Sequence, residues 1–183
     1  DARRAAWEAV GVHVDELSSL VLSIGLPDEP EPGEPGVRTL RRLRRSGPIR
    51  AGLVRLCENP VVVASAADEL GAACPPLVCV NGRPSAAVWR LLDLLAAGGA
   101  RFAYHGDFDW GGAAIAAAVY ARVGFTPWRY DAASYRGAAC DAPLTGRPVD
   151  TPWDPGLSGA MRARGVRVEE ELVLGDLMRD LAG

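Results

Sequence analysis

Short apolar runs alternate with helical patterns along most of the chain. Buried strands are predicted at 53–57, 77–80 and 101–104, and each is followed by a segment with the three-to-four-residue apolar spacing of a helix. Asn59 and Pro60 suit the start of the first such helix, as its N-cap and first helical residue. This alternation predicts right-handed βαβ crossovers and an α/β, Rossmann-like fold, in which helices flank a parallel sheet.

The pattern changes toward both ends. Apolar positions three and four residues apart predict an N-terminal helical extension over 1–24, and the Pro, Gly and acidic residues of 27–36 predict an extended linker. We therefore expect a helical segment with its linker at 1–36 and an α/β domain with C-terminal helices at 37–183. Beyond Gly124 weaker signals predict these elements: a fourth strand at 128–130 and helices near 157–164 and 168–181.

Composition indicates a globular protein. The chain has 183 residues, of which 49% are hydrophobic and 23% charged, enough for a real core. No apolar run approaches the ~20 residues of a membrane span. The four cysteines show no CxxC spacing, which does not favour a structural zinc site. We expect a soluble protein of the reducing cytoplasm, without membrane contact.

Positive charge is concentrated in one segment. The net charge of −3 argues against binding nucleic acid by bulk charge, so any basic surface must be local. Guanidinium groups bind phosphate in bidentate fashion, which favours a nucleic-acid backbone contact, but a solvated face or a dock for an acidic partner fits equally well. The segment contains these residues: Arg38, Arg41, Arg42, Arg44, Arg45, Arg50 and Arg55.

Asp107 and Asp109 follow the strand predicted at 101–104. With Phe108 between them, both carboxylates are expected to point to one face of extended chain. Two such charges ~5 Å apart repel by roughly 1 kcal/mol in water and by more in a drier site, and Mg²⁺ would relieve that repulsion. Alone, the pair is a weak signal, because solvated loop acids and helix caps are common.

Glu58 strengthens the case for a metal site. It follows the strand predicted at 53–57, so in a parallel sheet it shares an edge with the two aspartates and adds a third hard ligand or a general acid/base. Glu170 is a further candidate metal ligand, although it and Glu171 also suit a helix first turn. His105 is more typical of a packed, hydrogen-bonded residue than of a catalyst.

Several motifs together resemble the Toprim domain of primases, topoisomerases and related nucleases. The pattern there is a Glu after one strand and a DxD after a later one. Taken together, the longer motifs around these acids are similar to those of JetD-like Toprim subunits of Wadjet plasmid-defence systems, which are encoded beside SMC-like ATPases. They resemble the topoisomerase VI A subunit more distantly. The motifs are Thr39 to Leu43, Cys57 to Pro60, Pro76 to Cys79, Tyr104 to Gly112, Pro127 to Arg129 and Pro152 to Pro155.

The resemblance implies a function for these acids. It implies DNA as substrate, Mg²⁺ or Mn²⁺ as cofactor, a metal-binding role for Asp107 and Asp109, and an acid/base and metal role for Glu58. Topoisomerase VI-like enzymes need a tyrosine on a domain that precedes Toprim, whereas every tyrosine here lies at or after Tyr104, which favours hydrolysis.

Two functions are therefore weighed. The first is a Mg²⁺-dependent DNA endonuclease with Glu58, Asp107 and Asp109 as its catalytic residues. It would act within an SMC-like complex whose other subunits supply most of the DNA binding. The second is a non-catalytic scaffold of such a complex. A DxD phosphotransferase or phosphatase fits less well, because its nucleophilic Asp would end the first strand, where Glu58 stands. Self-association is left open.

Overall fold

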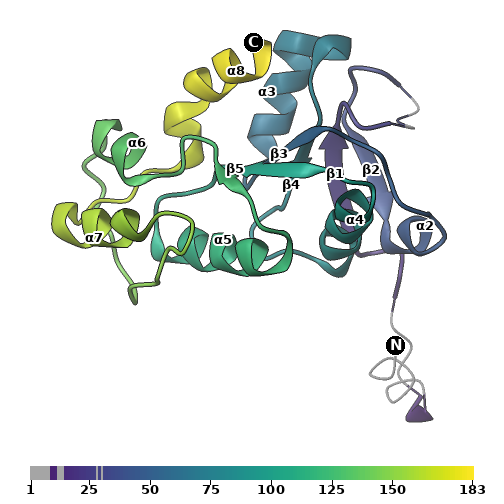
Figure 1. Ribbon diagram of the computed structural model, residues 1–183, viewed down its shortest axis with the longest axis horizontal. Coiled ribbons are helices and arrows are strands. Elements are labelled where there is room, and N and C mark those ends of the chain that lie inside the picture. Colours follow the sequence, from purple (N-terminus) through teal and green to yellow (C-terminus); the bar gives the residue numbers. More distant parts are fainter. Residues whose placement is uncertain (1–8, 12–14, 28, 30) are drawn as a thin grey trace.

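The computed structural model describes residues 9–11, 15–27, 29 and 31–183, and it confirms the α/β fold. A six-stranded, mostly parallel sheet has the order β2-β1-β4-β3-β5-β6 and is flanked by helices (Figure 1). The strands are β1 (Leu20–Ile24), β2 (Gly36–Thr39), β3 (Leu53–Cys57), β4 (Leu77–Cys79), β5 (Arg101–Tyr104) and β6 (Thr126–Pro127). The helices are α2 (Leu40–Arg44), α3 (Pro60–Leu70), α4 (Ala86–Ala97), α5 (Trp110–Val123), α6 (Ala132–Gly137), α7 (Pro155–Arg164) and α8 (Leu174–Ala182), with 3₁₀ turns at Gly71–Ala73 and Glu170–Val173.

The central strands match the predicted ones. β3 pairs in parallel with β4 on one side and with β5 on the other, so their carboxyl ends meet at one edge of the sheet. Helices α4 and α5 cover one face, and α3 and α8 cover the other (Figure 1). Two buried apolar clusters fill the two layers, because these strands carry apolar side chains on both sides.

The helical prediction is wrong for Leu20–Ile24, which forms β1, and for residues 15–19, which form bends instead of a helix. This strand pairs antiparallel with β2 and with β4. Val21 and Ile24 are both buried, and their spacing of three imitates a helical stripe although they belong to a strand with apolar residues on both faces. Much of the remaining predicted extension, 1–8 and 12–14, lies outside the described residues. The linker at 27–36 joins β1 to β2, so the sheet extends across the expected boundary.

Two C-terminal elements also differ from expectation. The last strand is Thr126–Pro127 rather than 128–130, and the helix expected at 168–181 begins only at Leu174. Val168 instead forms a bridge with Phe108, which keeps the preceding chain extended. The helix predicted near 157–164 is confirmed as α7. Within the described ranges, no helix has the length and apolarity needed to cross a bilayer.

Candidate carboxylate site at the sheet edge

Glu58 and Asp107 meet at the carboxyl edge of the sheet. Leu56 and Tyr104 are register partners in the parallel pairing of β3 with β5, so the residues that follow each strand emerge side by side. The backbone N–H of Asp107 donates a hydrogen bond to Glu58 Oε2 at 3.3 Å. The structure therefore places the Glu58 carboxylate against the backbone of Asp107, 49 positions away in sequence, and the charge of Asp107 acts on Glu58.

Two glycines make room for the Glu58 carboxylate. A Cβ atom on Gly106 would lie 2.9 Å from Glu58 Oε2 and 2.9 Å from the Tyr104 hydroxyl. A Cβ atom on Gly112 would lie 3.1 Å from the same Oε2 and 2.3 Å from the Asp107 carbonyl oxygen. The 2.3 Å contact with backbone excludes a side chain at position 112, so glycine is required where the first turn of α5 approaches the acid, whereas a side chain at position 106 would displace Glu58 and Tyr104.

Asp109 begins helix α5. It is the N-cap residue, and its Oδ1 accepts a hydrogen bond from the Gly112 N–H at 2.7 Å. Both aspartates were expected to alternate along a regular strand. Strand β5 ends at Tyr104, however, so Asp107 and Asp109 lie in the segment between β5 and α5 and are not positioned by strand geometry. Capping fixes one oxygen of Asp109 at the helix start, beside Asp107 in sequence.

Glu170 connects the C-terminal segment to the site. Its fully buried carboxylate accepts hydrogen bonds from the backbone N–H groups of Glu58 (3.1 Å) and Asn59 (2.6 Å). Its own N–H donates to Asp107 Oδ1 at 2.8 Å. Next to it, Glu171 accepts a hydrogen bond from the Asn59 side chain. Glu170 thus holds the backbone at Glu58 through its carboxylate, and it holds the Asp107 side chain through its own backbone N–H.

The acids raise one another's pKa values. Burial raises the pKa of Glu58 to about 7, and the charges of Asp107, Asp109 and Glu171 act in the same direction. Burial also raises the pKa of Asp107, with Asp109 and Glu171 contributing. The pKa of Glu170 is raised strongly by its burial. Negative charge is therefore costly at this edge, and a bound cation would stabilise it.

The donor set fits a hard divalent cation of the Mg²⁺ type. Within the described part of the chain, no three His, Cys, Asp or Glu side chains converge to hold a metal ion by themselves. Mg²⁺ commonly uses only one or two protein carboxylates, with substrate phosphate and water as the other ligands. Glu58 and Asp107 supply two carboxylates that are near enough for the charge of Asp107 to raise the pKa of Glu58, and both side chains are partly accessible.

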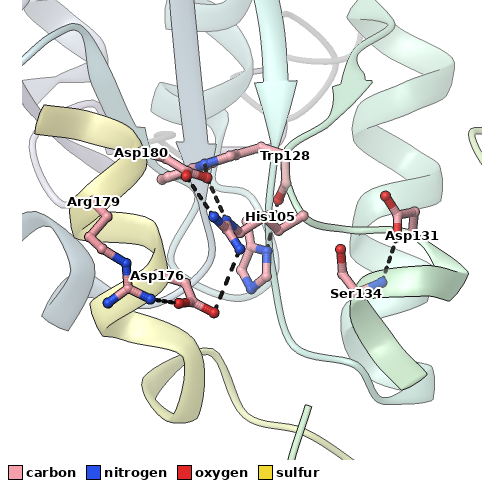
Figure 2. Close-up of polar contacts among 8 residues, drawn as sticks. His105, Trp128, Asp131, Ser134, Asp176, Arg179 and Asp180 are labelled. Atoms are coloured by element: carbon pink, nitrogen blue, oxygen red, sulfur yellow. Dashed lines mark hydrogen bonds and ion pairs between the residues drawn. The ribbon is translucent and has the colours of Figure 1, made fainter. Parts of the chain in front are cut away.

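His105 lies in a different environment from the carboxylates, and its ring meets that of Phe108 edge-on. Its Nδ1 contacts the Trp128 carbonyl oxygen at 2.9 Å (Figure 2). A carbonyl only accepts, so Nδ1 carries the proton and Nε2 is an acceptor, for which the described residues provide no hydrogen-bond partner. Burial lowers the pKa of His105 to about 4, which keeps the ring neutral. His105 also lines a cavity of about 190 Å³ with Phe108, Arg129 and Asp176.

Sequence reasoning missed the ion pairs that surround this histidine. Arg129 Nε donates to Asp180 Oδ2 at 2.6 Å, and the Trp128 indole N–H donates to the same oxygen at 3.0 Å (Figure 2). Arg129 also pairs with Asp176 and has a left-handed backbone, with φ of 51°. These contacts attach α8 to the chain after β6. No local pattern in the sequence indicates them, because the partners come from distant segments.

The fold and this edge define an α/β protein with an anionic site at the ends of two parallel strands. Residues 36–181 match the family described as "Protein of unknown function C-terminus (DUF2399)", and the chain belongs to that family. No curated protein matches the chain.

Proposed function

We propose that this protein is a metal-dependent DNA endonuclease that cleaves phosphodiesters by hydrolysis. The observation that carries the proposal is the approach of Glu58 and Asp107 at the edge where open α/β sheets bind ligands. The Toprim-like motifs around both acids support it, and the family match covers the same part of the chain. By that resemblance we place the protein in an SMC-like anti-plasmid complex of the Wadjet type.

The residues have distinct roles in this proposal. Glu58 and Asp107, with Asp109 beside them, would hold Mg²⁺ or Mn²⁺ against a phosphate of the DNA. When bound, the cation supplies positive charge that offsets the charge developing on the scissile phosphate. With a pKa of about 7, Glu58 exchanges a proton readily near neutral pH, which suits a general acid/base for the attacking water or the leaving oxygen.

Three of the four tyrosines are buried in the fold, which favours hydrolysis over a covalent tyrosyl intermediate on any of the three. Tyr104, Tyr130 and Tyr135 are fully buried. The hydroxyls of Tyr130 and Tyr135 donate to backbone carbonyls of Asp107 and Val166, which fixes them inside the fold. Burial raises the pKa values of Tyr104 and Tyr130 well above 10, which disfavours a phenolate nucleophile.

The test is cleavage of plasmid DNA by the protein with its partner proteins, in Mg²⁺ or Mn²⁺. We expect Asp107→Asn to lower the cleavage rate by more than the roughly 100-fold that loss of an outer-shell group can cost. Asp68→Asn, an exposed acid on α3, is the matched control and should cleave like wild type. Equal cleavage by wild type and Asp107→Asn would refute the proposal.

A non-catalytic scaffold is the second candidate, and the hydrogen bonds of the acids favour it. Asp107, Asp109 and Glu170 each accept a backbone N–H, so all three have structural work without a metal. Calorimetric titration with Mg²⁺ or Mn²⁺ separates the two functions. Absence of binding at millimolar metal, together with cleavage by the assembled complex that chelator does not change, would favour the scaffold.

A further inference from the structure

The arginine-rich segment begins at the same sheet edge as the carboxylates. β2 is antiparallel to β1, and β1 is antiparallel to β4, so β2 runs in the same direction as β3, β4 and β5. Through Leu22, Val37 is level with Cys79, which is level with Cys57. Helix α2 therefore starts at the edge where Glu58 emerges.

The distance along this edge follows from the strand order. β2 is three strands from β3 and four from β5. At ~4.8 Å per strand, the start of α2 lies roughly 14 Å from the end of β3 and roughly 19 Å from the end of β5. A duplex rises 3.4 Å per base pair, so this interval corresponds to about four to six base pairs.

Five arginines on and after α2 form what we call the arginine surface. The segment 35–57 contains seven arginines and no Asp or Glu. Two of the seven serve the fold: Arg38 is buried against Glu29, and Arg55 donates to the Asp180 carbonyl. The remaining five are exposed: Arg41, Arg42, Arg44, Arg45 and Arg50.

Charge on the arginine surface is only partly neutralised. Glu16 contacts Arg44 at 2.8 Å and Arg41 at 3.8 Å, so one carboxylate is shared between guanidinium groups. Arg45 and Arg50 extend the positive charge past the end of α2. The whole chain has a charge of −3, so this local excess is opposite in sign to the rest of the protein.

The shape and the polar lining of the arginine surface favour binding of a polyanion over binding of a protein. Two adjacent hollows of about 410 and 450 Å³ share Arg42 and Ser46. A third, of about 720 Å³, is lined by Arg44 and Arg90 together with Trp89 and the Arg122–Asp93 ion pair. The leucines of α2, Leu40 and Leu43, are buried and offer no apolar anchor. Protein interfaces have an apolar centre, whereas nucleic-acid interfaces are polar and positively charged.

We propose that the arginine surface binds the phosphodiester backbone of a nucleic acid, about four to six base pairs from the carboxylates when the ligand is a duplex. The role of the carboxylates rests on the proposed function, whereas binding at the arginine surface does not. Backbone contacts set the position of a duplex without reading its sequence. The chain would thus position the DNA on one side of the carboxylate site through its own contacts, in addition to the DNA contacts made by its partner proteins.

The experiment is fluorescence anisotropy of a labelled duplex with the full chain, in EDTA, over a range of salt from about 50 to 200 mM. We expect Arg41→Gln with Arg45→Gln to weaken binding about tenfold and to reduce the slope of log K against log salt by about two. Arg101→Gln with Arg136→Gln removes two exposed arginines elsewhere and is the matched control. Circular dichroism confirms that both double variants are folded.

Three outcomes overturn the inference. They are the absence of salt-dependent binding by wild type, an unchanged affinity and slope in Arg41→Gln with Arg45→Gln, and an equal loss in the control. Asp68→Asn, measured in the same EDTA assay, should bind like wild type. If the surface variants lose binding while wild type and Asp107→Asn cleave equally, the inference stands and the nuclease proposal fails. If Asp107→Asn alone loses cleavage and the surface variants bind normally, the reverse holds.

Discussion

Two groups of ionisable side chains, the carboxylates at the sheet edge and the ion pair near His105, differ in how their charge is balanced. At the sheet edge, the charges that raise the pKa of Glu58 belong to other acids, Asp107 foremost. Near His105, Arg129 and Asp180 form a two-point ion pair. The comparison separates charge that is balanced by an opposite charge within the fold from charge that is not, and carboxylates with raised pKa values of the second kind cluster at functional sites.

Removing Glu170 should have the largest effect on stability. In Glu170→Ala the buried N–H groups of Glu58 and Asn59 lose their acceptor, so we expect the free energy of unfolding to fall by about 3 kcal/mol. Urea denaturation measures it. Glu170→Gln keeps one oxygen and should lose less. An Ala variant as stable as wild type would show that Glu170 does not hold this edge.

The neutral His105 should make the fold sensitive to acid. The unfolded histidine binds a proton near pH 6.5, whereas the folded one stays neutral until about pH 4. Wild type should therefore lose stability as pH falls from 6.5 to 4, by on the order of 2–3 kcal/mol. His105→Gln lacks this titration, so its stability relative to wild type should rise over that interval. A difference that does not change with pH contradicts the assignment.

Glu58 should respond to pH in the opposite sense. Its unfolded carboxyl loses a proton near pH 4.5, and its folded one near pH 7, so ionisation destabilises the fold as pH rises between these values. Between these pH values, we expect the free energy of unfolding of Glu58→Gln to rise by about 1–2 kcal/mol relative to that of wild type. Thermal melts with and without Mg²⁺ check it, since a cation bound by Glu58 should reduce the gain. A gain that Mg²⁺ leaves unchanged argues against a metal at Glu58.

The smallest effect is expected at the balanced group. Asp180→Asn removes a partly exposed ion pair with Arg129, and such pairs contribute roughly 0.5–1 kcal/mol. The loss should diminish at high salt, because salt screens exposed charges. Urea denaturation at low and high salt measures it. A loss as large as that of Glu170→Ala would mean that the Arg129 pair, not Glu170, is the main attachment of the C-terminal segment.

The central fold was predictable because its strands are continuous apolar runs. Leu53–Cys57, Leu77–Cys79 and Arg101–Tyr104 are flanked by clear helix signals, which also placed Glu58 and Asp107 at one edge. Leu20–Ile24 was not predictable in the same way, because apolar residues on both faces of β1 hide the alternation. The strand Thr126–Pro127 has only two residues, which is too short for an alternation of apolar and polar positions to reveal it in the sequence.

The supporting contacts of the site were not predictable. The acids at Glu169, Glu170 and Glu171 fit a helix first turn equally well, so nothing local marks Glu170 as the buried partner of Glu58. The left-handed backbone of Arg129 is likewise unexpected for a residue with a long side chain. Both depend on tertiary contacts that the local pattern does not encode.

The link between Glu58 and Glu170 also bears on when the site forms. These residues are 112 positions apart, so their contact closes one of the longest loops in the chain. Contacts of such separation carry a large loop-closure cost and slow the folding of the regions that need them. The β3–β5 sheet can pair before the C-terminal segment docks, but the contacts of Glu170 with the backbone at Glu58 and with Asp107 form only after it has docked. A chain that is still folding therefore lacks the finished site, and the activity proposed for it would appear last.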